Sequence, residues 1–189
     1  MRLRNIYALF LIVGMLATVR AWDFDALRVL VARQYGSQAE RTVQDWQSLL
    51  ANAAARSEPE KLERINAFFN RRIRYEEDQK VWNTVDYWAT PLEFIGRGQG
   101  DCEDYVISKY FSLRQLGVAT QKLRITYVSA RIGGSSSRVT QAHMVLTYYE
   151  TPDAEPLVLD NLINSILPAS RRSDLTPVYS FNSEGLFVG

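Results

Sequence analysis

In the first third of the chain, apolar residues recur at every third or fourth position, which places them on one face of a helix. Ser57 and Glu60 have the form of a capping box that opens a helix, and so do Thr90 and Glu93. In the second box, Pro91 occupies the first helical position, where proline is well tolerated. The periodicity predicts three helices in this region, over residues 27–35, 43–53 and 62–73.

The segment from Cys102 to Leu116 carries apolar residues around most of its circumference. A helix with that pattern is buried on several sides, so we expect this one at the centre of the fold. A glycine-rich loop precedes it, and Gly117 is suited to end it.

After Gly117 the hydrophobic period changes from about 3.6 residues to about 2, which is typical of strands. A polar loop at residues 133–137 separates the first two predicted strands. Helices followed by strands favour an α+β domain with an antiparallel sheet. No repeat or long linker divides the chain, which predicts one domain over residues 22–189. The predicted strands are 123–128, 142–149 and 157–162, with a weaker signal at 178–181.

Residues 1–21 have the layout of a secretory signal peptide. Arg2 and Arg4 form a short basic start, an apolar or small-residue run follows, and Ala21 stands at the expected cleavage position. The apolar run is short for a membrane span, so we expect an exported protein that starts at Trp22, without stable membrane insertion. The alternative is an uncleaved signal anchor.

The charge balance excludes one class of partner. The chain has 22 Lys and Arg against 21 Asp and Glu. Removal of Arg2, Arg4 and Arg20 with the signal leaves 19 basic residues (22 − 3) against the same 21 acids. This balance gives no electrostatic reason to expect nucleic-acid binding.

The chain contains one cysteine, Cys102, and one histidine, His143. Exported proteins usually use cysteines in pairs, so the single thiol is either an inert buried side chain or a nucleophile. At the start of the predicted central helix, unpaired N–H groups and the helix dipole favour a thiolate. His143, in the second strand, is a candidate base, although a lone histidine in a strand is often structural. Asp160 in the third strand, or alternatively Asn161, would orient its ring, as in covalent acyl-transfer sites.

Three acids crowd the cysteine: Asp101, Glu103 and Asp104. Their negative charge would raise the pKa of the thiol and suppress the nucleophile. A hard cation bound by their oxygens would remove that repulsion, and three carboxylates beside a loop with free carbonyls suit calcium better than zinc. The alternative is a set of solvated acids at a helix start, with Asp101 as the N-cap.

Four stretches of sequence carry a family pattern: GRGQGDCEDY (96–105), AHMVL (142–146), VLDNL (158–162) and DYWATPLEF (86–94). Together they resemble the bacterial transglutaminase-like cysteine peptidases, and most of all the LapG type, periplasmic proteases that act on large biofilm adhesins. The likeness spans about residues 60 to 185. It implies a papain/transglutaminase-like core, in which the nucleophile stands at a buried helix start packed on an antiparallel sheet.

The resemblance also implies a role for each site residue. Cys102 would be the nucleophile, His143 the general base and acid, and Asp160 the orienting residue, while the three acids beside Cys102 would bind a calcium ion. The activity of the family is calcium-dependent cleavage of an adhesin near its N-terminus, at a paired-alanine site. An inner-membrane receptor that senses cyclic di-GMP sequesters the protease. We therefore expect a periplasmic cysteine endopeptidase that controls biofilm attachment.

Two other functions would use the same residues. An acyl-transferring transglutaminase would pass the acyl group to an amine, and a non-catalytic calcium-binding module would only dock a partner. The backbone N–H of Cys102 is a candidate donor to the oxyanion. Trp82, Tyr87 and Trp88 either wall a shallow substrate cleft or pack in the core.

Overall fold

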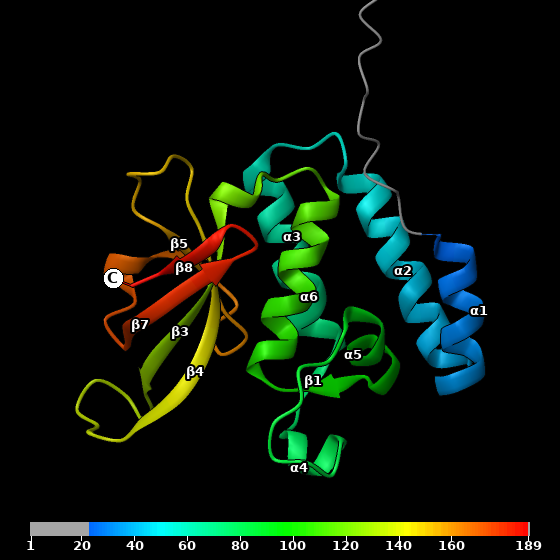
Figure 1. The fold of residues 1–189 in the computed structure, drawn as a ribbon, viewed down its shortest axis with the longest axis horizontal. Coiled ribbons are helices and arrows are strands. Elements are labelled where there is room, and N and C mark those ends of the chain that lie inside the picture. The colour runs from blue at the N-terminus through cyan, green and yellow to red at the C-terminus, as the bar shows by residue number, and fades with distance from the viewer. Residues whose placement is uncertain (1–22, 189) are drawn as a thin grey trace, which may run out of the picture.

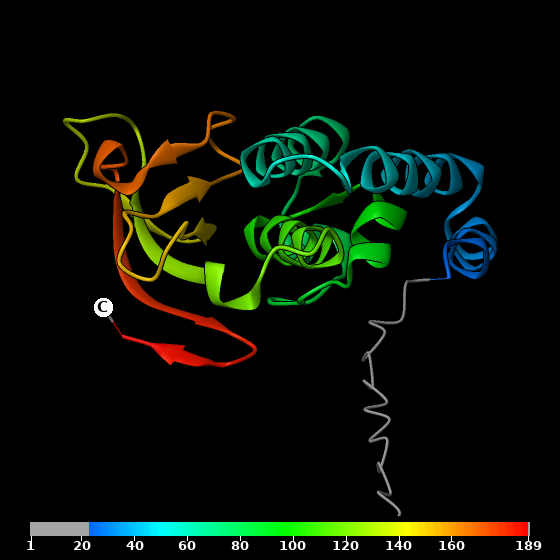
Figure 2. The ribbon, with the colours of Figure 1, turned by 90° about the horizontal axis from the view of Figure 1, so that it is seen from above.

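The computed structural model describes residues 23–188, so the predicted signal peptide and its cleavage position lie outside the described residues. Within this range, α-helices form one half of the molecule and a curved antiparallel sheet forms the other (Figure 1; Figure 2). No helix among residues 23–188 has the length and apolarity needed to cross a bilayer. The helices are α1 (Phe24–Tyr35), α2 (Ser37–Ala53), α3 (Glu58–Arg72), α4 (Asp78–Val81), α5 (Pro91–Arg97) and α6 (Cys102–Gln115), with 3-10 turns η1 (Thr120–Lys122) and η2 (Ala169–Arg171).

The three helices predicted near the N-terminus are confirmed as α1, α2 and α3, and both predicted capping boxes are present. At α3, the Ser57 N–H donates to the Glu60 carboxylate over 3.1 Å. At α5, the Thr90 N–H donates to Glu93 over 2.9 Å, and the Thr90 hydroxyl accepts from the Glu93 N–H over 3.3 Å. These reciprocal bonds satisfy backbone donors that a helix start otherwise leaves free.

Helix α6 lies at the centre of the fold, as its all-round apolar pattern predicted. It packs against α3 and α5 on one side and against the sheet on the other (Figure 1). The indole N–H of Trp46, from α2, donates to the buried Ser112 hydroxyl of α6 over 2.9 Å. Gly117 follows the helix with φ of 82°, a left-handed conformation that favours glycine.

The sheet has the strand order β6-β5-β4-β3-β7-β8, and every neighbouring pair is antiparallel. The expected α+β class is confirmed, and the weakly signalled last strand is present. The third predicted strand is shorter than expected, because it ends at Leu159 and leaves Asp160 in the loop that follows. The strands are β3 (Leu123–Arg131), β4 (Thr140–Tyr148), β5 (Leu157–Leu159), β6 (Leu167–Pro168), β7 (Leu175–Asn182) and β8 (Gly185–Phe187).

A small parallel pair of strands leads the chain into α6. β1 (Arg74–Tyr75) pairs with β2 (Gln99–Gly100), and the Glu76 N–H donates to the Gly100 carbonyl over 2.9 Å. A Cβ at Gly100 would collide with the carboxylate of Asp104 and with the Phe94 ring. Glycine is therefore required for the backbone to pass so close to the acids at the start of α6.

Candidate active site

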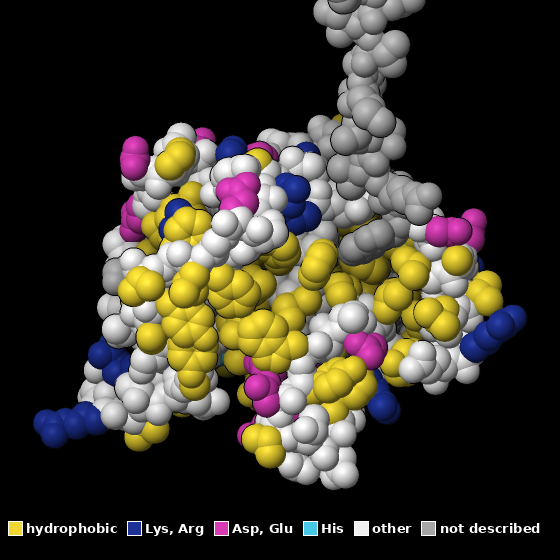
Figure 3. All heavy atoms as spheres, in the orientation of Figure 1, with side chains coloured by type: hydrophobic (Ala, Val, Ile, Leu, Met, Phe, Trp, Pro, Cys, Tyr) yellow, Lys and Arg dark blue, Asp and Glu magenta, His cyan; other side chains and the backbone are white. Residues whose placement is uncertain are grey.

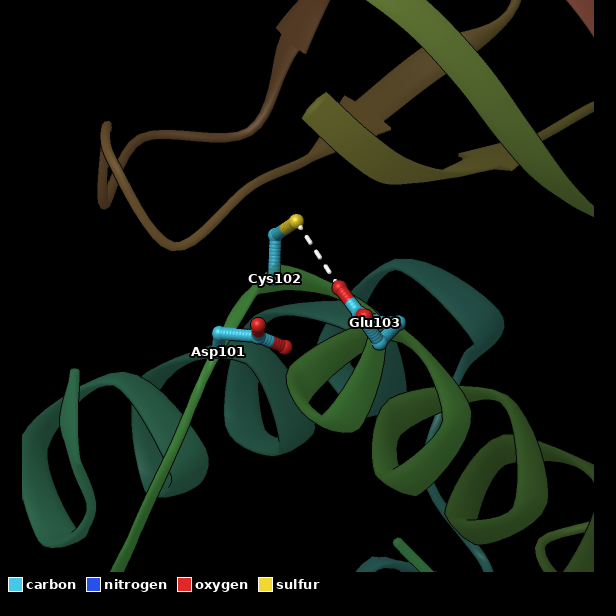
Figure 4. A group of neighbouring side chains, drawn as sticks. All are labelled: Asp101, Cys102 and Glu103. Carbon is cyan, nitrogen blue, oxygen red and sulfur yellow. Dashed lines mark hydrogen bonds between the residues drawn. The ribbon is translucent and has the colours of Figure 1, made fainter. Parts of the chain in front are cut away.

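Cys102 and His143 meet at a cleft between the helices and the sheet. Cys102 is the first residue of α6, His143 lies in β4, and both line a cleft of about 470 Å³. The sulfur points from α6 toward the strands (Figure 4), where the backbone of Met144, the residue next to His143, acts to lower the pKa of the thiol. The fold thus brings the only thiol and the only imidazole of the sequence into one site.

The ring of His143 is oriented by Asp160. His143 Nε2 lies 2.8 Å from Asp160 Oδ1, and the two residues are 5% and 1% exposed. This contact goes to Asp160 and not to the alternative residue, Asn161, whose side-chain oxygen is buried without a hydrogen-bond partner among the described residues. Because Nε2 is engaged by the carboxylate, Nδ1 is the ring nitrogen available for the thiol.

Asp160 is anchored through both its side chain and its backbone. The sequence placed it inside a strand, and this was wrong. It lies just beyond β5, where its Oδ1 also accepts the N–H of Leu162 over 3.1 Å and so shapes the turn. Its Oδ2 accepts from the buried guanidinium of Arg172 over 2.7 Å. Its backbone carbonyl accepts from Asn70 over 2.7 Å and from Lys109 over 3.1 Å.

These partners decide the charge of Asp160. Burial by itself would raise the pKa of the carboxyl, but the hydrogen bond and charge of His143, together with Leu162 and Arg172, lower it to about 2. Asp160 is therefore ionised throughout the neutral range. A fixed carboxylate stabilises the imidazolium that forms when His143 takes a proton.

The surroundings of the thiol, in contrast, disfavour its ionised form. Burial is the largest effect that raises the pKa of Cys102, and the neighbouring carboxylates of Glu103 and Asp101 raise it further. The Cys102 sulfur lies 3.1 Å from a carboxylate oxygen of Glu103, to which it donates (Figure 4). The sequence-based prediction that these acids oppose the thiolate is confirmed. The nucleophile needs a positive charge nearby to offset them.

The acids form a wider cluster than the sequence indicated. Asp101, Glu103 and Asp104 are joined by Asp78 from α4 and by Asp86, in overlapping groups whose ligand atoms lie within 4.8 Å of one another. Asp101 occupies the N-cap position of α6, but its side chain makes no capping hydrogen bond. The N-cap alternative therefore does not account for this residue.

Three oxygens of the cluster are buried without a hydrogen-bond partner among the described residues: Asp78 Oδ1, Asp101 Oδ1 and Asp104 Oδ2. The other oxygens of Asp78 and Asp104 accept backbone N–H groups from Tyr87 and Ala89, the latter over 2.8 Å, which fixes both carboxylates. Buried carboxylate oxygens without partners are costly unless a ligand satisfies them. Three carboxylate oxygens at one place are hard donors of the kind that bind calcium.

The pKa values of the acidic cluster are raised, as expected for carboxylates that have no positive charge nearby. Burial raises the pKa of Asp101 to about 9, with the hydrogen bond and charge of Glu103 adding to the effect. Burial also raises the pKa of Asp104 to about 7 and increases that of Asp78. A bound divalent cation would reverse these shifts, because it stabilises the ionised carboxylates.

Sequence reasoning missed Asp78, Asp86 and Arg172. Asp78 lies in an acidic run at residues 76–78, and Asp86 opens the stretch 86–94 that carries part of the family resemblance, but neither was expected to belong to the acidic cluster. Nothing in the sequence around Arg172 marks it as the partner of Asp160.

The three aromatic residues upstream of the cysteine divide between the two proposed roles. Trp88 lines the cleft, as expected of a wall. Trp82 and Tyr87 pack against each other, with ring centroids 4.4 Å apart, and are not among the residues that line it. Tyr127 and Tyr179, from the sheet, line the cleft instead, and no motif in the sequence marks them as cleft residues.

Comparisons with known proteins agree with this arrangement. The model of the bacterial transglutaminase-like cysteine proteinase family matches residues 31–176. Calcium-bound LapG from Legionella pneumophila is 42% identical, with a TM-score of 0.76, and the match covers 88% of this chain and 87% of that one. The EGTA-treated form of that protein matches with the same identity and TM-score, and the match covers 88% of this chain and 85% of that one. No curated protein sequence matches the chain.

The likeness to LapG confirms the expected transglutaminase-like core, with helices packed on an antiparallel sheet. It also agrees with the cleft, in which a cysteine at a helix start faces a histidine on a strand. By the family match and this likeness, the chain belongs to the bacterial transglutaminase-like cysteine proteinases and is a cysteine peptidase.

Proposed function

We propose that this protein is a calcium-dependent periplasmic endopeptidase that cleaves a large cell-surface adhesin near its N-terminus and so controls biofilm attachment. The observation that carries the proposal is the cleft that Cys102 and His143 line together, with the buried Asp160 holding the His143 ring. Each of the three has one chemical role in peptide-bond cleavage.

In the proposed reaction, the Sγ proton passes to His143 Nδ1 and the thiolate attacks the carbonyl carbon of the substrate. The negative charge on the carbonyl oxygen is stabilised by N–H donors, for which the Cys102 backbone N–H is our candidate. The imidazolium then donates its proton to the leaving amine, and an acyl-enzyme forms. Water, deprotonated by His143, hydrolyses the acyl-enzyme and regenerates the thiol. Asp160 keeps the ring oriented and balances its positive charge throughout.

The proposed calcium ligands are Asp101, Glu103 and Asp104, with Asp78 as an additional candidate. The three buried carboxylate oxygens without partners support a cation at this position. So does the calcium-bound state of the similar Legionella LapG. A bound calcium ion would supply positive charge that offsets the acids beside the thiol. The ligand residues themselves hold the loop before α5 in place, because Asp78 and Asp104 accept hydrogen bonds from the backbone N–H groups of Tyr87 and Ala89.

The substrate and the regulation of the enzyme are proposed from its likeness to LapG. The substrate would be a large repeat adhesin cut at a paired-alanine site. An inner-membrane receptor that senses cyclic di-GMP would sequester the protease while the nucleotide is abundant. The proposed location follows from the predicted signal peptide at residues 1–21.

Cleavage of an N-terminal adhesin fragment by the purified protein tests the proposal. The wild type with calcium should yield two products whose new ends, identified by mass spectrometry, lie at paired alanines. Cys102→Ala should abolish cleavage while its melting temperature and its binding to the fragment persist. Unchanged cleavage by this variant would support the non-catalytic binding module instead. Products joined to an added primary amine would indicate acyl transfer rather than hydrolysis.

The calcium requirement is tested separately. Excess EGTA should stop cleavage and lower the melting temperature, and added calcium should restore both. Magnesium in place of calcium is the matched control, because it prefers a smaller octahedral site and should restore less activity. Equal activity and stability with and without EGTA would remove calcium from the mechanism and leave the catalytic residues untouched.

A further inference from the structure

A row of stacked aromatic rings runs along the wall of the catalytic cleft. Tyr127 of β3 stacks on Tyr179 of β7 with ring centroids 5.2 Å apart and planes within 7°. Tyr179 is followed by Phe181 at 6.4 Å, and Phe181 by Trp88 at 6.1 Å. We call these four residues the aromatic row. It joins the sheet to the loop before α5, and the mechanism proposed above uses none of its members.

The aromatic row borders both the catalytic cleft and a second groove. Tyr127, Tyr179 and Trp88 line the same cleft as Cys102 and His143. Trp88 and Phe181 also line a neighbouring groove of about 510 Å³, together with Tyr110 and Phe111 of α6. Figure 3 shows apolar side chains gathered over this region, between the sheet and the helices.

Two of these rings are too exposed to serve only as core. Trp88 is 47% exposed and Phe111 is 45% exposed. Tyr179 and Trp88 are not among the buried residues of the main core; they stack on Tyr127 and Phe181, which are partly buried and pack against that core. Exposed apolar surface that adjoins a reactive cleft is typical of a binding site for a partner of matching chemistry.

We propose that the aromatic row binds the polypeptide substrate on one side of the scissile bond, as an extended segment with apolar side chains at alternate positions. A chain held with its carbonyl at Cys102 must leave the cleft along its walls, and the aromatic row forms one of them. Side chains on the same side of an extended chain repeat every 6.6 Å or so, close to the spacing of the rings. This inference rests on the peptidase function proposed above and adds its specificity.

The experiment uses a mixture of unfolded bacterial proteins as the probe, digested in calcium by the wild type and by two variants, Tyr179→Ser and Trp88→Ser. Mass spectrometry of the new ends gives the residue preference at each position around the cut. For the wild type we expect apolar residues to be enriched at alternate positions on one side only. Each variant should lose that enrichment and still cut. Val178→Ser is the matched control, since Val178 is a 48% exposed apolar residue of β7 outside the cleft lining.

Two synthetic peptides make the test quantitative. One carries the preferred apolar residues, and the other has serine at those positions. Loss of one aromatic contact should lower kcat/KM for the apolar peptide by about tenfold, as expected from burial of one side chain. The rate on the serine peptide should fall much less than the rate on the apolar peptide, which separates a lost contact from a damaged fold.

The outcomes distinguish this inference from the proposed function. If the wild type cuts neither the mixture nor the adhesin fragment, the proposed function fails and takes the inference with it, whereas cleavage of the fragment alone would overturn only the role of the aromatic row. If it cuts without an apolar preference, or if the variants keep the preference, only the role of the aromatic row is overturned. An equal loss of rate on both peptides would also overturn it, because the rings would then be structural.

Discussion

Lys109 offers a sharp test of the electrostatics in the core. It lies in the middle of α6 with no exposed surface, and its Nζ donates to the backbone carbonyl of Asp160 over 3.1 Å. Burial lowers the pKa of Lys109 from 10.5 to about 7, and the charge of Asp160 opposes only part of this effect. The wild-type protein therefore bears a desolvation cost that an apolar side chain of similar length would avoid.

The sign and size of the effect follow from the two pKa values. Between about pH 7 and 10.5 the unfolded chain holds the Lys109 proton and the folded chain does not, so stability rises with pH by about 1.4 kcal/mol per unit. Below pH 7 both states are protonated and the cost is constant, on the order of 5 kcal/mol. Lys109→Met removes this titration. Its stability relative to the wild type should therefore increase by about 2 kcal/mol from pH 9 to pH 7.

The variant should not leave the carbonyl of Asp160 unpaired, because Asn70 also donates to it over 2.7 Å. Urea unfolding at pH 7, 8 and 9, in saturating calcium to hold the acidic cluster in one state, measures the free energy of both proteins. Lys80→Met is the control, since the Lys80 side chain is 67% exposed and should give no pH-dependent difference in this range. A difference between Lys109→Met and the wild type that is independent of pH would refute the reasoning.

Three further predictions concern the site. Asp160→Asn should lower kcat roughly a thousandfold, because the amide orients the His143 ring but cannot balance its charge; steady-state kinetics measures the loss. Since the pKa of Asp160 is about 2, its contribution to stability should persist above about pH 4 and be lost as the pH falls toward 2, as urea unfolding of the wild type and Asp160→Asn should show. Gly100→Ala should weaken calcium binding at least tenfold in calorimetry, because its Cβ displaces the Asp104 carboxylate, whereas Gly185→Ala, where a Cβ meets open space, should not.

The elements that the sequence predicted well are those whose signal is local. Two capping boxes and a three-to-four residue period located the helices, and a glycine with φ of 82° marked the end of α6. The all-round apolar pattern of α6 also predicted its central position. What it did not indicate is that Lys109 would lie inside that helix without exposure, because periodicity does not show how a long amphipathic side chain is accommodated.

The parts of the site that escaped prediction depend on contacts between distant segments. Arg172 reaches Asp160 from the position directly after the 3-10 turn η2, twelve residues later, and Asn70 reaches it from α3, ninety residues earlier. Asp78 meets the acids of α6 only because β1 pairs with β2 and brings the two segments together. Neither the spacing of residues nor the composition predicts contacts between distant segments. A sequence motif therefore identifies the reactive residues but not the groups that determine their protonation.

The acids of this site fall into two sets whose pKa values shift in opposite directions, and the contrast bears on the cation. Asp160 has the guanidinium of Arg172 and the ring of His143 beside it, and its pKa falls to about 2. Asp101 and Asp104 have no cationic partner among the described ion pairs, and their pKa values rise to about 9 and about 7. Burial alone does not explain the difference, because burial raises the pKa in all three cases. The missing component is positive charge, which supports our proposal that a calcium ion belongs to the active folded state.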